Sequence, residues 1–231
     1  MSAQRAIPSS WLHDDTEEDL VGADWHQQAI RALSDSLDDL AADLNLQWHV
    51  GDQLTLAGTK PDGTPWRPSP DITIYPSAGA AMRAEMVVST DGVPALIIEV
   101  ASPSTWQYDV DLQAGKAWGY LHLGVPNYLV FDPLGDLLDE RCRGWQQHGG
   151  AVHAWRPRAD GRYYAISLDV SFHPEGDLLR VYGPDGRPVA FNYEKAQRIR
   201  AQERDLRAQA RRIADLEAEL KRLRGEKPDH E

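Results

Sequence analysis

Two acidic residues stand in short segments that are otherwise apolar. Asp71 precedes Ile72-Thr73-Ile74, and Glu99 lies between Leu96-Ile97-Ile98 and Val100. Runs of β-branched and aliphatic residues flanked by Pro, Ser or Gly predict short buried strands. A carboxylate in such a strand is costly unless it is paired, hydrogen-bonded or bound to a cation. The two acids therefore predict a shared positive partner.

The oxygen atoms of these segments suit a hard cation. The carboxylates of Asp71 and Glu99, with the backbone carbonyl of Val100, are donors that Mg²⁺ or Mn²⁺ prefers. Such an ion stabilises charge on a phosphodiester and helps to deprotonate an attacking water, which predicts in-line hydrolysis. The structural alternative is a pair of buried acids that cap strand ends or pair with an arginine such as Arg67 or Arg83.

Composition limits the setting of the chain. The single cysteine, Cys142, excludes an internal disulfide and a cysteine-based zinc site, and it favours a reducing cytoplasm. No apolar run approaches the roughly 18 residues of a membrane span, and the first residues lack the apolar core of a signal peptide. We therefore expect a cytoplasmic protein without membrane contact.

The net charge of −12 is unevenly distributed. Residues 191–224 contain ten Lys and Arg against six Asp and Glu, so the rest of the chain is strongly acidic. An acidic body argues against a broad phosphate-binding surface, because nonspecific nucleic-acid binding depends on Lys and Arg. It does not exclude a nuclease, since metal ions can screen a site built from carboxylates.

The elements before the acidic strands are a helix and a hairpin. Apolar residues recur at three and four positions from Asp24 to Leu44, with Asp24 available as the N-cap, which predicts a helix. Residues 48–50 and 53–57 alternate like two strands around Gly51-Asp52, which predicts a hairpin.

A crossover unit follows Glu99. Apolar residues from Asp109 to Leu123 have helical spacing, Gly124 fits a C-terminal cap, and 127–131 form a compact apolar strand. Strand, helix and strand in this order predict two parallel strands in one sheet. Short strands at 137–142, 163–167 and 178–182 are expected to extend it. The predicted fold class is α/β, a mixed sheet flanked by helices.

The C-terminal segment has the pattern of a coiled coil. Apolar residues fall seven apart at Ile199, Leu206, Ile213 and Leu220, with Leu216 and Leu223 at the companion position. We expect this helix to support a homo-oligomer, in the simplest case a dimer; an amphipathic helix folded back on the body is the alternative. The predicted organisation is a lead-in segment at 1–22, a domain at 23–190 and a coiled-coil tail at 191–231.

Several residues together form a pattern. It comprises Pro70-Asp71, Glu99 through Thr105, Lys116 with Tyr120, Gly124-Val125-Pro126, and Tyr128 through Pro133. This pattern resembles the Uma family of restriction-endonuclease proteins, which belongs to the PD-(D/E)XK nuclease superfamily. The resemblance covers roughly residues 15–185 and implies a restriction-endonuclease-like fold.

The resemblance also implies residue roles. Asp71 matches the first acid of the nuclease motif and Glu99 the second, and both would bind metal with the carbonyl of Val100. Ala101 stands where the simple motif has lysine; in the Uma pattern the lysine comes from the following helix, and Lys116 matches it, to orient water or stabilise the transition state.

Three further positions are accessory candidates. Either Asp109 or Asp111 matches an aspartate that precedes the family's lysine, although each also suits a helix N-cap. His26 resembles a histidine that opens the N-terminal helix in the family.

The leading hypothesis is a Mg²⁺- or Mn²⁺-dependent endonuclease that hydrolyses DNA, with Asp71, Glu99 and Lys116 as catalytic residues. The alternative is a nuclease-fold binding or regulatory module that lacks turnover and recruits a partner through its coiled coil. The contact of Lys116 with the two carboxylates discriminates between them. A third possibility is an assembly protein in which the domain recognises nucleic-acid ends or structures.

Overall fold

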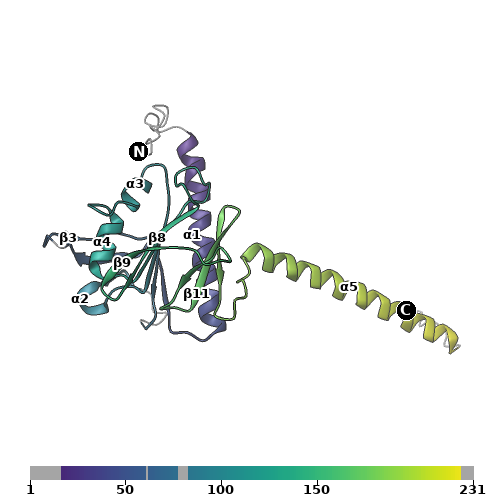
Figure 1. Cartoon of the computed structure of the whole chain (residues 1–231). Helices are drawn as coiled ribbons and strands as arrows, with labels where there is room; N and C mark the ends of the chain where they lie inside the picture. Colours follow the sequence, from purple (N-terminus) through teal and green to yellow (C-terminus); the bar gives the residue numbers. More distant parts are fainter. Residues whose placement is uncertain (1–16, 61, 78–82, 225–231) are drawn as a thin grey trace. The chain divides into compact units, whose positions relative to one another are not determined.

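The computed structural model describes residues 17–60, 62–77 and 83–224, and the chain divides into two compact units between Val189 and Ala190. The helices and strands described below are labelled in Figure 1. The helices are α1 (Glu17–Asp43), α2 (Val88–Asp91), α3 (Trp106–Asp109), α4 (Lys116–Leu123) and α5 (Asn192–Leu223).

The first unit contains three β-sheets. A six-stranded sheet has the order β1-β4-β6-β7-β8-β9, and two three-stranded sheets have the orders β3-β2-β5 and β10-β11-β12. The strands are β1 (His49–Asp52), β2 (Thr55–Thr59), β3 (Pro65–Trp66), β4 (Ile72–Tyr75), β5 (Glu85–Val87), β6 (Leu96–Val100), β7 (Asn127–Phe131), β8 (Cys142–His148), β9 (Ala151–Trp155), β10 (Tyr163–Ala165), β11 (Val170–Glu175) and β12 (Leu178–Tyr182).

Helix α1 begins at Glu17, seven residues before the predicted start at Asp24. The predicted lead-in at 1–22 is therefore wrong for residues 17–22, and its first sixteen residues lie outside the described part of the chain. The predicted apolar face is buried, with Ile30, Leu33 and Leu37 at its centre.

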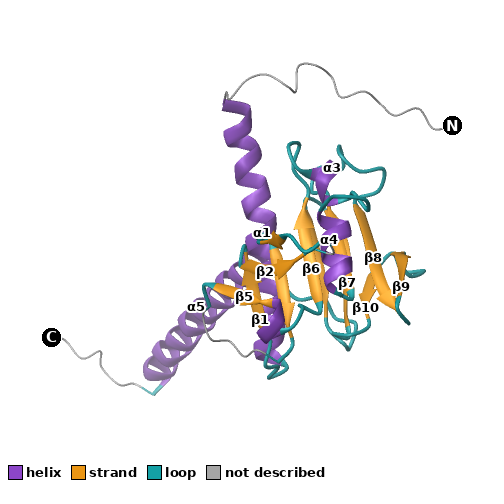
Figure 2. Cartoon of the chain, turned by 90° about the vertical axis from the view of Figure 1, so that its left-hand side faces the viewer, coloured by secondary structure: helices purple, strands orange, loops and turns teal. Residues whose placement is uncertain are grey.

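The two main helices lie on opposite faces of the six-stranded sheet (Figure 2). Helix α1 contacts β1, β4 and β6, and it also contacts β12 of the neighbouring sheet. Helix α4 covers the other face, where Ala117 and Tyr120 join the core cluster with Ile97 and Tyr128. The sheet core is therefore closed on both sides, as its fully buried central strands require.

The crossover prediction is confirmed. Strand β6 pairs in parallel with β7, and Gly124 ends α4 in a left-handed conformation with φ 95°. The predicted continuous helix from Asp109 to Leu123 is wrong, because it is divided into α3 and α4. Between them the Asp111 carboxylate accepts the Gln113 N–H at 2.8 Å, a turn that interrupts helical hydrogen bonding.

The predicted hairpin around Gly51-Asp52 is wrong. Strand β1 pairs with β4 and strand β2 pairs with β3 and β5, so the two strands belong to different sheets. Gln53 between them has φ 50° and donates its N–H to the Asp71 carbonyl at 3.1 Å. The chain thus turns away from β1 instead of pairing with it.

The strand predicted at 137–142 is also wrong, since β8 begins only at Cys142. The preceding segment is held by Asp132, whose buried carboxylate accepts the backbone N–H groups of Leu134, Gly135, Leu137 and Leu138 at 2.7–3.2 Å. These bonds take up the donors that a strand would use.

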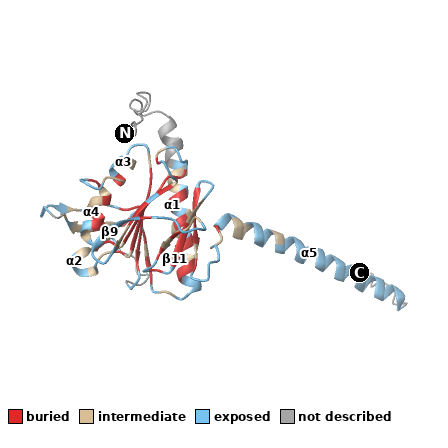
Figure 3. Ribbon diagram, in the orientation of Figure 1, coloured by how far each residue is buried: buried red, intermediate tan, exposed pale blue. Residues whose placement is uncertain are grey.

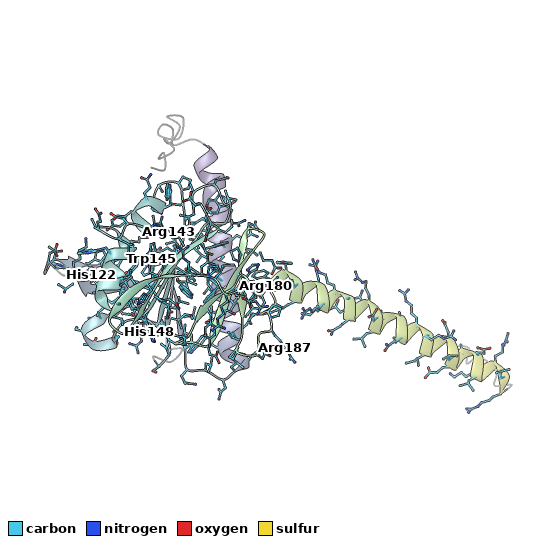
Figure 4. All side chains as sticks on the ribbon, viewed as in Figure 1. His122, Arg143, Trp145, His148, Arg180 and Arg187 are labelled. Carbon is cyan, nitrogen blue, oxygen red and sulfur yellow. The ribbon has the colours of Figure 1, made fainter. Side chains whose placement is uncertain are left out.

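The remaining strands extend the fold in two directions. Strands β8 and β9 continue the six-stranded sheet, whereas β10, β11 and β12 form a sheet of their own. Within that sheet Arg180, labelled in Figure 4, is buried and pairs with Glu175 through two hydrogen bonds at 2.8 and 2.9 Å.

The second unit consists mainly of α5, whose surface is exposed along most of its length (Figure 3). The Glu194 carboxylate accepts the Phe191 N–H at 2.8 Å, which caps the helix start. Within the described residues, we find no helix that combines the length and the apolar character needed to cross a membrane.

Candidate active site

Asp71 directly precedes β4 and Glu99 lies in β6, and these two strands are antiparallel neighbours. Ile72 of β4 is opposite Ile98 of β6, so the next step of the register places Asp71 opposite Glu99. Directly opposed residues project from the same face of a sheet, with their Cβ atoms about 5 Å apart. The sheet therefore brings the two predicted acids together at one end of β6.

A first set of contacts fixes Asp71. Its Oδ2 accepts the Val100 N–H at 2.8 Å and lies 3.5 Å from Nε2 of His26. The same His26 nitrogen is 2.9 Å from the Val100 carbonyl oxygen. Since a carbonyl only accepts, His26 must carry its proton on Nε2 and donate it there. His26 of helix α1 thus lies within 3.5 Å of two oxygen atoms, the Val100 carbonyl oxygen and Oδ2 of Asp71.

A second set of contacts fixes Glu99. Tyr120 of α4 donates its hydroxyl to Oε1 at 2.9 Å, and the Lys116 ammonium lies 3.0 Å from Oε2. Both partners come from one helix, four residues apart, so they present adjacent side chains to the sheet. Each carboxylate oxygen of Glu99 therefore has its own donor.

Lys116 also bridges to a third carboxylate. Its Nζ lies 2.9 Å from Oδ1 of Asp109, while Thr105 donates its hydroxyl to Oδ2 at 3.0 Å. The Tyr128 hydroxyl donates to the Asp109 backbone carbonyl at 2.8 Å, which anchors α3 to β7. Figure 2 shows α3 near the end of β6. We call Asp71, Glu99, Asp109, Lys116 and His26 the acid–lysine cluster.

The break between α3 and α4 is what allows this bridge. Gly115 precedes Lys116, and a Cβ there would lie 2.1 Å from the Tyr108 carbonyl oxygen and 2.6 Å from the Asp111 Cβ. Only glycine permits this close approach. It places Lys116 in the first turn of α4, over the end of β6.

Burial strongly shifts the pKa values of the acidic residues Glu99 and Asp109 in the cluster. Glu99 and Asp109 are each 1% exposed and Asp71 is 8% exposed. Burial, together with the nearby charges of Asp71 and Asp109, raises the pKa of Glu99 to about 8 against the opposing effect of Lys116. Burial likewise raises the pKa of Asp109. Burial therefore disfavours the ionised form of these carboxylates, and such perturbed pKa values are a feature of functional sites.

The pKa values of the two basic residues, Lys116 and His26, are also raised, which favours their charged forms. Burial alone would lower the pKa of Lys116, but Glu99 and Asp109 raise it above its ordinary value, so the ammonium stays charged. Burial also opposes ionisation of His26, yet the hydrogen bond and charge of Asp71 raise the pKa of this imidazole. Both groups are held as hydrogen-bond donors to the carboxylates.

The structure brings together most of the predicted site residues. Asp109 belongs to the cluster, whereas the Asp111 carboxylate accepts the Gln113 N–H in the turn between α3 and α4. Lys116 contacts Glu99, but among the described ion pairs its second partner is Asp109 and not Asp71. The arginine part of the structural alternative is wrong, because Arg67 pairs with Glu85 and Arg83 pairs with Asp91.

Sequence reasoning gives no role to two residues that the structure places at the site. Tyr120 is part of the family pattern, and its position four residues after Lys116 could have indicated a shared helix face. Thr105 follows the apolar strand, and only the fold of the 101–109 segment brings it to Asp109.

The donor set is compatible with a divalent cation. The cluster opposes three carboxylates to one lysine and one histidine, and the Asp71, Glu99 and Val100 oxygens are hard donors. Among the described residues, no three His, Cys, Asp or Glu side chains form a ready-made metal cage.

Comparison with known proteins gives the class first. A family model described as "Putative restriction endonuclease" matches residues 16–183, which cover most of the first unit. The family is Uma2, and the chain belongs to it.

Solved structures are similar at a low level, and one of them is described here. It is described as a "putative nuclease belonging to DUF820" from Anabaena variabilis, with 15% identity and a TM-score of 0.40. The match covers 57% of this chain and 66% of that chain. No curated protein matches the chain.

Proposed function

We propose that this protein is a divalent-metal-dependent endonuclease that hydrolyses DNA phosphodiester bonds at the acid–lysine cluster. The observation that carries the proposal is the Glu99 carboxylate, which faces Asp71 across the sheet and is held by Tyr120 and Lys116 at 2.9 and 3.0 Å. Membership of the Uma2 family supports the choice of nuclease chemistry.

Asp71, Glu99 and the Val100 carbonyl would hold the cation. When bound, Mg²⁺ or Mn²⁺ would neutralise phosphate charge and lower the pKa of an attacking water. Val100 and His26 orient Asp71, and Tyr120 orients Glu99, so these oxygens are positioned before the substrate arrives. The protein thus supplies a fixed donor set and needs little rearrangement.

Lys116 would act on the phosphate. Its ammonium can donate to a non-bridging oxygen and stabilise the charge that develops as water adds to phosphorus and the P–O bond breaks. Water supplies the hydroxyl group on phosphorus and the proton that ends on the leaving oxygen. Asp109 keeps Lys116 charged and aimed at the cluster.

The test combines binding and cleavage. Calorimetric titration with Mg²⁺ and Mn²⁺, in the presence of a nonhydrolysable DNA oligonucleotide, should show binding to the wild type and loss of it in the Asp71→Ala, Glu99→Ala double variant. Plasmid cleavage with either ion should fall at least about a hundredfold in Asp71→Asn and Glu99→Gln. Asp139→Asn, an exposed carboxylate far along the chain, is the matched control.

The outcomes separate the hypotheses. Unchanged cleavage in Asp71→Asn would remove this cluster from the reaction. Metal and DNA binding without turnover would favour the binding or regulatory module. Absence of metal binding in both proteins would overturn the proposal.

A further inference from the structure

The second unit presents an apolar stripe that the helix itself does not cover. Its main members are Ile199, Leu206, Ile213 and Leu220, which are 56%, 64%, 57% and 50% exposed. They lie seven residues apart, so they follow one face of the helix with the drift of a left-handed supercoil. A long single helix in water is marginal unless such a face is packed.

We infer that α5 pairs with α5 of a second copy as a parallel, in-register, two-stranded coiled coil. This inference does not depend on the chemistry of the first unit. It assigns the four residues above to heptad position a and Gln202, Gln209, Leu216 and Leu223 to position d. The charges beside the stripe and the two glutamines within it determine the orientation.

Charge complementarity favours the parallel arrangement. In a parallel coiled coil each g residue meets the e residue of the following heptad in the other chain. Each such pair that carries two charges is opposite in sign: Arg198 with Glu203, Arg212 with Glu217, and Glu219 with Arg224, the residue directly after α5, of the second copy. The remaining g residue, Asp205, meets an uncharged alanine.

The antiparallel arrangement with the same overlap reverses this result. There g residues meet g residues and e residues meet e residues. Arg212 would face its own copy, Asp205 would face Glu219, and Glu203 would face Glu217, so every pair of charged residues formed within α5 would be repulsive. Within its own helix Glu203 has only a distant exposed partner, Arg207 at 4.0 Å.

The two glutamines favour the same choice. In the parallel arrangement Gln202 and Gln209 each meet the same residue of the second copy, so their amides can hydrogen-bond across the seam. In the antiparallel arrangement they would face Leu220 and Ile213, and a buried amide without a partner is costly. Polar residues at seam positions commonly fix register and orientation in this way.

A mixing experiment with full-length variants tests the charge pattern. Arg212→Glu and Glu217→Arg each place like charges together in their own homodimer, which should weaken it about tenfold. Mixed together, the two variants restore both attractive pairs. We expect heterodimers above the share given by random assortment, measured by native mass spectrometry with one variant isotopically labelled. The helix-internal cost of each substitution is the same in both kinds of dimer, which makes the comparison matched.

A cross-linking experiment tests the register. Gln202→Cys should form a disulfide-linked dimer under mild oxidation, because the residue meets its own copy only in the parallel arrangement. Arg204→Cys, on the opposite side of the helix, is the control, and the buried Cys142 contributes the wild-type background. A monomeric wild type in sedimentation equilibrium, random assortment of the variants, or equal cross-linking of both cysteines would overturn the inference.

Discussion

Lys116 shows at the scale of single residues how the candidate site depends on the fold. The sequence predicted Asp71 and Glu99 in or beside short buried strands, and the structure has Glu99 in β6 and Asp71 directly before β4. The bridge from Lys116 to Asp109 was not predictable, because a continuous helix was expected through both residues. Their contact requires the break at Gly115, which follows from a steric fit that only the folded chain reveals.

His26 gives a prediction on pH dependence. Its pKa is raised in the folded state by Asp71, although burial opposes the shift. A raised folded pKa means that the imidazolium contributes stability fully below its unfolded pKa of about 6.5 and loses it as the pH rises through the folded value. His26→Gln should therefore cost about 1.5 kcal/mol of unfolding free energy near pH 5.5 and clearly less near pH 8.5.

Urea unfolding at both pH values measures this difference. His153→Gln, which replaces an exposed imidazole on β9, serves as the matched control. An equal cost of His26→Gln at the two pH values would contradict the role of the Asp71 contact.

Asp132 shows that one side chain can determine a whole element. It is completely buried and replaces a strand by a turn through its four backbone hydrogen bonds. Asp132→Ala would leave these N–H groups without their acceptor, so we expect a loss of about 3–5 kcal/mol in unfolding free energy. Asp136→Ala, an exposed acid in the same loop, should change stability by less than about 0.5 kcal/mol.

Thermal and denaturant unfolding of the two variants compare these costs. A similar small effect of both would mean that the loop is held by other contacts.

Elements with local signals were the ones that the sequence predicted well. Strand β7, the cap at Gly124 and the C-terminal end of α1 follow from periodicity and turn chemistry within a few residues. The hairpin at 48–57 failed for the opposite reason. Its strands alternate correctly, but their partners, β4 for β1 and β5 for β2, lie further along the chain and compete successfully with local pairing.

The whole molecule divides into two units that different probes can follow. All eight tryptophans precede residue 190, whereas α5 contains none. We expect tryptophan fluorescence to report unfolding of the first unit at a temperature that does not depend on protein concentration. Circular dichroism at 222 nm should contain an additional transition that moves to higher temperature as concentration rises, because association stabilises α5 by mass action.

Thermal scans at two widely separated protein concentrations measure both signals in one sample. Transitions that shift together would contradict the independence of the two units. An ellipticity signal that does not respond to concentration would contradict the pairing of α5.

The seam of α5 is unevenly apolar, with glutamine at its first two d positions and leucine at the last two. Since a ribosome makes the chain from its N-terminus, the segment with the strongest tendency to associate emerges after the first unit. The first unit of each chain can therefore complete its folding before the segment that associates with a second copy has been synthesised. Assembly in this order would protect newly made chains from entangling while their sheets are still incomplete.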